Sequence, residues 1–264
     1  MIVGVDHLAL SCDDVDAAGA VLRRAGFREA FVERGLPNAA VKGLFVHELH
    51  PAHSIGYYEA GGGTPLELTH YGGPVAARPA HYVPLLAAPP GGQAEDGDWS
   101  GVWAAAGYGA AGAYAWPELG ATVWALSSSG PPAVRAVLSP AADLGRAVAF
   151  WTAVGCRPVA EGAADGRGWA RLAFGAPLPA WKLELVVAEG DPRSDSCLDD
   201  RGFPCLAFLC TSLERDGETL VAAGALETSG RFDVTVNGRA LAVAFFRGPE
   251  GELLELVDVR RDVG

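Results

Sequence analysis

The chain opens with a short apolar segment that carries a single histidine, residues 4–12, with the sequence GVDHLALSC. An acidic turn follows, and residues 13–27 then have the spacing of an amphipathic helix that ends at Gly26. A weaker version of this strand and helix recurs at residues 134–155, and a third version covers residues 204–224. Because an internal repeat is a stronger fold signal than any single motif, we interpret the rest of the chain through it.

The composition limits the class of protein. The chain has 264 residues, of which 50% are hydrophobic, so it can bury a large core as one domain or two. It contains no apolar run of about 18 residues, which excludes a membrane-spanning helix, and its first residues do not have the pattern of a secretion signal. The five cysteines are an odd number without zinc-type pairing, which indicates reduced thiols. We therefore expect a cytoplasmic protein.

The formal net charge of −12 indicates the kind of partner. A surface that binds nucleic acid or an anionic membrane needs clustered basic residues, so we expect neither partner and expect a small molecule instead. The chain has two lysines, Lys42 and Lys182, and its other basic residues are arginines, a skew that we ascribe to genome composition. A repeat fused into one chain does not require a homodimer and does not exclude one.

Each repeat is predicted to contain a strand, a helix and about three further strands, the last of which carries a glutamate. His7 in the first strand is followed by Glu67 in the last, and similar stretches separate Arg135 from Glu184 and Cys205 from Glu255. A second, diverged unit is inferred within residues 80–130. It has His81 at the place of His7 and Trp124 where the other units have glutamate.

This order of elements resembles the vicinal oxygen chelate superfamily, which includes glyoxalase I, extradiol dioxygenases and bleomycin-resistance proteins. Residues 4–71 and 133–258 carry the resemblance, including the final strand GPEGELLELV. It implies an α+β fold of four βαβββ units that form two glyoxalase-like modules with curved mixed sheets. We expect an N-terminal module at residues 1–130, with the second unit diverged, and a C-terminal module at residues 131–264.

The resemblance also implies that two units pair to form a cup that holds one divalent metal ion. If the first unit pairs with the second, which we favour, the ligands are His7, His81 and Glu67. Two imidazoles and one carboxylate favour Fe²⁺, although Mn²⁺, Ni²⁺ or Zn²⁺ would also accept nitrogen and oxygen ligands. If the first unit pairs with the fourth, the cup holds His7, Glu67, Cys205 and Glu255, and His81 is structural.

Two groups of residues are predicted to contact the substrate. His53 and Tyr58 lie beside a predicted strand that faces the cup, and we expect them to be catalytic, with a histidine moving a proton near neutral pH. Trp103, Trp116 and Trp124 fall in the diverged unit and could form an aromatic wall that binds a flat substrate. The alternative for these tryptophans is core packing, which is the default for aromatic side chains.

The resemblance leaves two functions open. One is a metal-dependent enzyme that acts on a small oxygenated or aromatic compound, either as a dioxygenase or as an isomerase or lyase that works through an enolate. The other is a metal-free protein that sequesters an aromatic small molecule, as bleomycin-resistance proteins do. Since one fold supports many activities, the choice depends on the residues of the site.

Overall fold

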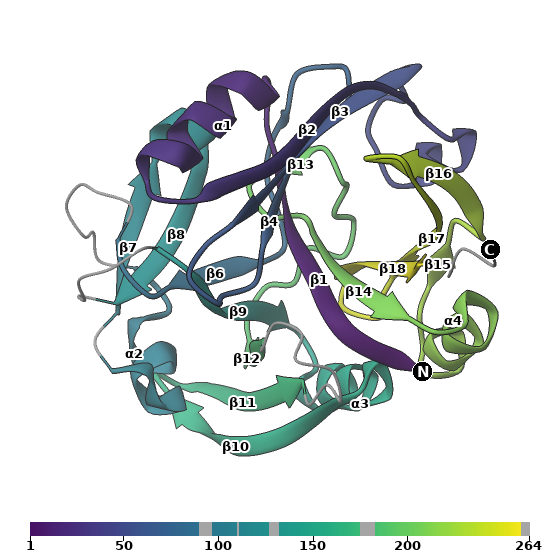
Figure 1. The fold of residues 1–264 in the computed structure, drawn as a ribbon. Coiled ribbons are helices and arrows are strands. Elements are labelled where there is room, and N and C mark those ends of the chain that lie inside the picture. The colour runs from purple at the N-terminus through teal and green to yellow at the C-terminus, as the bar shows by residue number, and fades with distance from the viewer. Residues whose placement is uncertain (90–96, 110, 127–131, 175–182, 260–264) are drawn as a thin grey trace.

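Figure 1 shows the fold in a computed structural model that describes residues 1–89, 97–109, 111–126, 132–174 and 183–259. The predicted fold class is confirmed, because the chain contains repeated strand–helix–strand units arranged in two curved mixed sheets. In the described part of the chain, no helix is long and apolar enough to cross a membrane.

The first and fourth units have the predicted order of elements. The first contains β1 (Ile2–Ser11), α1 (Val15–Arg24), β2 (Arg28–Pro37), the short 3₁₀ helix η1 (Ala40–Leu44), β3 (Ala52–Glu59) and β4 (Leu66–His70). The fourth contains β14 (Cys205–Cys210), α4 (Leu213–Ala222), β15 (Glu227–Thr228), β16 (Phe232–Val236), β17 (Arg239–Arg247) and β18 (Leu253–Val259).

The second and third units are also present, and the second is reduced. It contains β6 (Val83–Leu86), α2 (Ser100–Trp103), η2 (Ala104–Tyr108), β7 (Ala111–Trp116), η3 (Pro117–Leu119) and β8 (Ala121–Leu126). The third contains β9 (Val134–Ala141), α3 (Leu144–Val154), β10 (Cys156–Ala164), β11 (Arg167–Phe174) and β12 (Glu184–Glu189). Two short strands, β5 (Ala76–Pro79) and β13 (Asp200–Arg201), pair with each other between the units.

The strand order shows which units share a sheet. One sheet has the order β15-β17-β18-β14-β1-β4-β3-β2, and β1 lies antiparallel beside β14, as Figure 1 shows. The other has the order β10-β11-β12-β9-β6-β8-β7. The first unit therefore pairs with the fourth, and the second with the third. The pairing that we favoured from the sequence is wrong, and each sheet takes strands from both sides of residue 130.

The three longer unit helices begin where the sequence repeat predicts, and each begins at a polar capping residue. The side chains of Asp14, Asp143 and Ser212 accept hydrogen bonds from backbone N–H groups in the first turns of α1, α3 and α4. Such caps satisfy N–H groups that have no partner inside the helix. They fix the point at which the chain leaves the first strand of each unit.

The strand β1 separates two apolar clusters. Val5, Leu8 and Leu10 point into the main core, which contains side chains from both sheets and includes Trp151 of α3 and Phe208 of β14. Ala9 belongs to a different cluster on the opposite face of the strand, the concave face. Leu8, Ala9 and Leu10 follow the period of two expected for a strand that is buried on both faces, whereas Val5 lies before a register shift in β1 and does not follow it.

The concave face of the second sheet is filled by side chains. Trp103 of α2 and Trp124 of β8 are buried there together with Trp169 of β11. Glu184, the glutamate of the third unit, accepts a hydrogen bond of 2.5 Å from the hydroxyl of Tyr108 in η2. The helical segment of the diverged unit thus occupies the place where a ligand would enter this cup.

Glu250, in the turn between β17 and β18, ties the two sheets together although it is 1% exposed. Its carboxylate accepts hydrogen bonds from the backbone N–H of Ala142 at 2.7 Å and from Nε of Arg146 at 2.7 Å. Both partners lie at the start of α3 in the third unit. A buried carboxylate therefore caps a helix of the neighbouring sheet.

We expect Glu250→Ala to lower the free energy of unfolding by about 3 kcal/mol, because it removes a buried, charged acceptor that bonds Ala142 and Arg146 and leaves a cavity in its place. Urea denaturation followed by circular dichroism measures the change. The control is Glu214→Ala, which removes an exposed carboxylate paired with Arg231 and is expected to cost less than about 1 kcal/mol. Equal effects of the two substitutions would contradict the role given to Glu250.

Candidate functional site

The concave face of the sheet that contains β1 and β14 encloses a cavity of about 400 Å³. Its walls come from the first and fourth units, with η1 and the segment around Leu198 at its side. Apolar and aromatic side chains form most of the lining, and they include Phe31, Tyr57, Phe232 and Phe245. A cavity of this size with a few convergent polar groups is typical of a small-molecule site.

His7 lies at the centre of the polar groups. Asp6 and His7 are neighbours in β1 and would normally point to opposite faces, but the register with β14 shifts between Val5 and His7. This irregularity lets both side chains line the cavity, as a β-bulge does when it changes the direction of a side chain. Nδ1 of His7 then donates a hydrogen bond of 2.9 Å to the Asp6 carboxylate.

The other ring nitrogen of His7 faces two carboxylates. Nε2 lies 3.7 Å from Oε1 of Glu67 and 3.5 Å from Oε2 of Glu255, and it has no hydrogen-bond partner. With Nδ1 protonated, a neutral imidazole would direct its Nε2 lone pair at two negative groups. This is unfavourable unless a proton or a metal cation lies between them.

Strand register explains how the two glutamates reach the same place. Glu67 of β4 lies beside Ala9 of β1, and Glu255 of β18 lies beside Ala207 of β14. The antiparallel pairing of β1 with β14 relates these two arrangements by an approximate twofold axis. In both cases an alanine is the neighbour of the glutamate, so no large side chain covers the carboxylate from that strand.

The net effect of burial and neighbouring charges is to raise the pKa values of both His7 and Glu67. Burial lowers the pKa of His7, but Glu67, Asp6 and Glu255 together raise it well above its usual value. Burial also raises the pKa of Glu67, as do the neighbouring carboxylates, whereas His7 lowers it. In the absence of a metal ion, a proton on His7 therefore compensates the negative charge.

Cys205 occupies the position in β14 that corresponds to His7 in β1. It is 1% exposed and lines the same cavity, and its pKa is raised well above the usual value by burial and then by Glu255 and Glu67. The thiol is therefore protonated at neutral pH unless a cation displaces the proton. The alternative set that the resemblance implied, His7, Glu67, Cys205 and Glu255, is the one that the fold brings together.

His81 does not join this set, and its predicted role as a ligand beside His7 is wrong. It lies just before β6 in the other sheet, is 1% exposed, and its Nε2 lies 2.8 Å from the hydroxyl of Ser139. Because β6 pairs with β9 and not with β1, no strand connects His81 to the cavity. Burial, followed by the charge of Arg193, lowers the pKa of His81 to about 3, so the ring is neutral.

Of the two residues expected to be catalytic, one lines the cavity and the other does not. His53 of β3 lines the cavity, as predicted. Tyr58 points to the opposite face, where its hydroxyl donates to Glu29 and lies against Gly19 of α1, so it does not line the cavity. A shift of one residue along a strand reverses the face, and the tyrosine in the cavity is Tyr57.

Tyr57 holds its place through three contacts. Its hydroxyl donates a hydrogen bond of 3.0 Å to the backbone carbonyl of Asp6, and its ring stacks on Phe31 with a centroid distance of 5.6 Å. The same ring meets the edge of His7 at 6.0 Å. It therefore forms an aromatic wall beside the imidazole.

The predicted tryptophan wall is not part of this cavity. Trp103 and Trp124 pack in the second sheet, and Trp116 packs in the main core, each 4% exposed or less. Trp124 also borders a groove next to His81, away from His7. Core packing, the alternative reading, accounts for these three positions.

His7, Glu67 and Glu255 fit a divalent metal ion by the chemistry of their donor atoms. The unpartnered Nε2 faces two carboxylate oxygens, and the hydrogen bond from Nδ1 to Asp6 is the usual support for a metal-binding imidazole. Two ligands about 2.1 Å from one ion lie about 3.4 Å apart in a tetrahedral site, close to the 3.7 Å and 3.5 Å from Nε2 to the two carboxylates. The two carboxylates lie farther from each other, because the three ligand atoms are not all within 4.8 Å of one another. The set contains one imidazole and two carboxylates, not the two imidazoles that favoured Fe²⁺.

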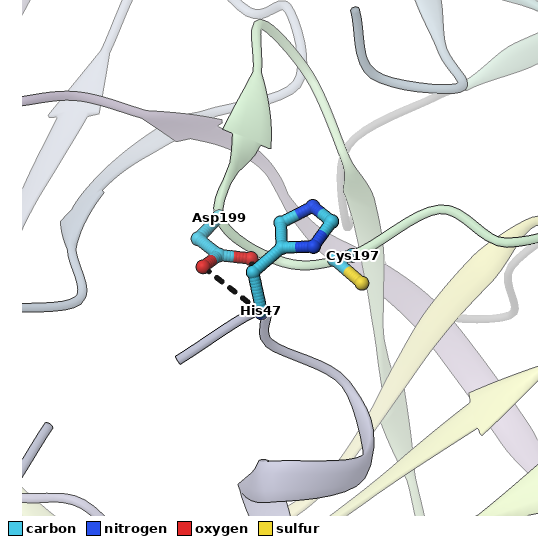
Figure 2. Close-up of side chains that lie close together, drawn as sticks. All are labelled: His47, Cys197 and Asp199. Carbon is cyan, nitrogen blue, oxygen red and sulfur yellow. Dashed lines mark hydrogen bonds between the residues drawn. The ribbon is translucent and has the colours of Figure 1, made fainter. Parts of the chain in front are cut away.

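A second group of ligand types lies outside the cavity, and Figure 2 shows it. The ligand atoms of His47, Cys197 and Asp199 lie within 4.8 Å of one another, a closer spacing than around His7. The polar atoms of this group already have partners. Both Asp199 oxygens accept from the backbone N–H of His47. Nε2 of His47 lies 2.8 Å from Oδ1 of Asp200. This group fastens the segment after η1 to the segment before β14.

Comparison with known proteins supports the fold. No protein-family model and no curated protein sequence matches the chain. Glyoxalase I from Zea mays superposes with a TM-score of 0.60 at 14% identity over 97% of this chain and 92% of its own. A candidate dioxygenase from Bacillus subtilis subsp. subtilis str. 168 superposes with a TM-score of 0.59 at 10% identity over 98% and 86%. The chain thus has the fold of vicinal oxygen chelate proteins.

Lys42 is a further residue of the cavity that sequence reasoning missed, besides Asp6 and Tyr57. It lies in η1, is 6% exposed, and lines the cavity opposite the strands. A lysine in a 3₁₀ turn has no strand or helix periodicity that would reveal its direction. Its rarity in an arginine-rich chain was the one available signal.

We expect the two neutral buried histidines to make the protein sensitive to acid. The pKa of His53 is lowered to about 3 by burial and then by Lys42, and that of His81 is also lowered to about 3. Between about pH 6.5 and pH 3 the unfolded chain binds these protons and the folded chain does not, so stability falls as the pH falls.

His81→Gln is therefore expected to flatten this fall by up to about one proton, or about 1.4 kcal/mol per pH unit. Urea denaturation at intervals from about pH 7 to pH 4.5 measures the slope. His50→Gln, which replaces a partly exposed histidine, is the control. Parallel curves for wild type and His81→Gln would contradict the assignment.

Proposed function

We propose that the protein is a divalent-metal-dependent enzyme that acts on a small oxygenated organic compound in the cavity at His7. The observation that carries this proposal is the buried Nε2 of His7, which has no partner and faces Glu67 and Glu255. His7, Glu67 and Glu255 would hold the ion, with Cys205 beside them. The fold of glyoxalase I and of the candidate dioxygenase supports the proposal in general terms.

The donor set favours proton transfer over oxygenation. The two carboxylates are hard ligands that suit a Lewis-acid ion, and imidazole binds several divalent ions, whereas Fe²⁺ oxygenases use two imidazoles and one carboxylate. A bound ion would polarise a carbonyl or hydroxyl oxygen of the substrate. We therefore place isomerisation or elimination through an enolate before dioxygenation.

The residues of the chain supply the remaining steps. Glu67 and Glu255 both line the cavity, so either carboxylate can accept a proton from a substrate that would take its place at the ion. Phe31 and Tyr57 provide an apolar surface for the body of the substrate and exclude water from the carboxylates. The Asp6 carboxylate holds the orientation of His7.

A metal-free binding protein is the second candidate, and a specific observation favours it. The pKa of His7 is raised well above its usual value, so a proton alone can stabilise the two glutamates. The cavity could then hold a small aromatic compound without any reaction. Metal content separates the two candidates.

We expect protein purified without chelators from metal-supplemented medium to carry about one divalent ion per chain, measured by mass spectrometry of the metal content. His7→Ala and Glu255→Gln should each weaken metal binding by at least about tenfold, because each removes a ligand. His81→Ala is the matched control, since it removes a buried histidine outside the cavity, and it should keep the metal.

Three results would overturn the proposal. Metal retained at full occupancy by His7→Ala would remove His7 from the site. Metal lost in Asp199→Asn but retained in Glu255→Gln would place the ion at His47, Cys197 and Asp199. Protein that carries no metal under these conditions but still binds aromatic compounds would favour the metal-free candidate.

A further inference from the structure

Lys42 is a buried amine without a carboxylate at ion-pair distance among the described residues. It extends from η1 into the cavity at His7 and also borders an adjoining cavity of about 650 Å³. Its Nζ lies 5.8 Å from the ring centroids of Tyr71, Phe232 and Phe245. Lysine is rarely buried without a charged partner, so its position needs an explanation.

One polar group lies close to the amine. Nζ of Lys42 lies 3.4 Å from Nε2 of His53, and Nδ1 of His53 lies 3.1 Å from the backbone carbonyl of Leu36. A carbonyl oxygen only accepts, so Nδ1 carries the hydrogen and Nε2 accepts from Lys42. The His53 ring also stacks on Tyr71 at 6.3 Å, which fixes its plane.

This arrangement is that of an activated nucleophile. A nucleophilic side chain lies within reach of a proton acceptor, and a third group orients the acceptor. Burial lowers the pKa of Lys42, although Glu255, Glu67 and Cys205 act in the opposite direction. A neutral amine in an apolar site attacks carbonyl carbons, and lysine is the residue that proteins use for this reaction.

We propose that Lys42 is a reactive amine that condenses with the carbonyl group of a small aldehyde or ketone with an apolar or aromatic body. The nitrogen lone pair forms a bond to the carbonyl carbon, and the carbonyl π electrons move to the oxygen. A proton passes from the nitrogen through Nε2 of His53 to that oxygen. The nitrogen lone pair then forms the C=N bond as the hydroxyl leaves, and the second proton of the nitrogen passes through Nε2 of His53 to the hydroxyl, which departs as water. The reverse steps release the compound.

The surrounding structure holds the amine in place for this reaction. The backbone N–H of Phe45 donates to the carbonyl of Lys42, and the N–H of Leu198 donates to the carbonyl of Phe45 at 2.6 Å. Asp199 holds His47 on the same segment. The three aromatic rings around Nζ exclude water and provide surfaces for an apolar substrate. This inference goes beyond the proposed function and does not depend on a metal ion.

Reductive trapping tests the proposal, and the sequence makes the readout simple because Lys182 is the one other lysine. The native protein is incubated with benzaldehyde and sodium cyanoborohydride, and the benzylated residue is identified by peptide mass spectrometry. We expect benzylation at Lys42 at least about tenfold faster than at Lys182 or at the α-amino group of Met1. Lys42→Arg should abolish the fast phase.

His53→Gln tests the positioning role of the imidazole. We expect it to slow benzylation of Lys42 by at least about tenfold while the circular dichroism spectrum stays that of the wild type. His81→Gln, a change at a buried histidine far from Lys42, should leave the rate unchanged. An unchanged rate in His53→Gln would overturn the assignment of the pair.

Two further results bear directly on the amine. Benzylation at Lys182 and Met1 with Lys42 unmodified in the folded protein would overturn the proposal, as would equal rates at Lys42 in native and urea-unfolded protein. The experiment is repeated after treatment with EDTA, and the same fast phase is expected. Failure of the metal site and failure of the reactive amine can therefore be told apart.

Discussion

The antiparallel pairing of β1 with β14 is the interaction on which the site depends. It joins the first strands of the first and fourth units and places His7 beside Ala207. Because β4 lies parallel to β1, and β18 parallel to β14, the same pairing brings Glu67 and Glu255 to His7 from two sides. The entropic cost of closing so long a loop grows only slowly with length, and burial of the core between the sheets offsets it.

The sequence predicts the units well and their pairing poorly. The repeat of a strand, a capped helix and a last strand with glutamate is visible in the local periodicity, and the fold class followed from it. Either pairing of units would bury the same apolar faces of the first strands, so periodicity does not distinguish them. His81 was assigned as a ligand only because the first unit was expected to pair with the second. Since the second unit pairs with the third, His81 lies in the other sheet.

Side-chain direction was predictable only where strands are regular. The shift between Val5 and His7 brings Asp6 into the cavity, and a strict period of two predicts the opposite. The same difficulty explains the choice of Tyr58 over Tyr57, because an error of one residue reverses the face of a strand. Lys42 lies in a segment without periodicity, so only the structure shows that its amine enters the cavity.

The concave face of the second sheet is filled by side chains, whereas that of the first sheet keeps a cavity lined by charged residues. The difference between the two faces indicates why the charged residues are there. In the second sheet, Tyr108 hydrogen-bonds the glutamate at position 184, and tryptophans fill the space. In the first, His7 and Lys42 are buried at a cavity, and the half-buried carboxylates of Glu67 and Glu255 line it beside them. Burying ionisable groups costs several kcal/mol per ion unless they are paired, and a filled apolar core would be more stable. The chain fills the concave face of the second sheet but leaves the cavity at His7 open. The cost of burying ionisable groups is therefore kept at the place where these groups can act on a ligand.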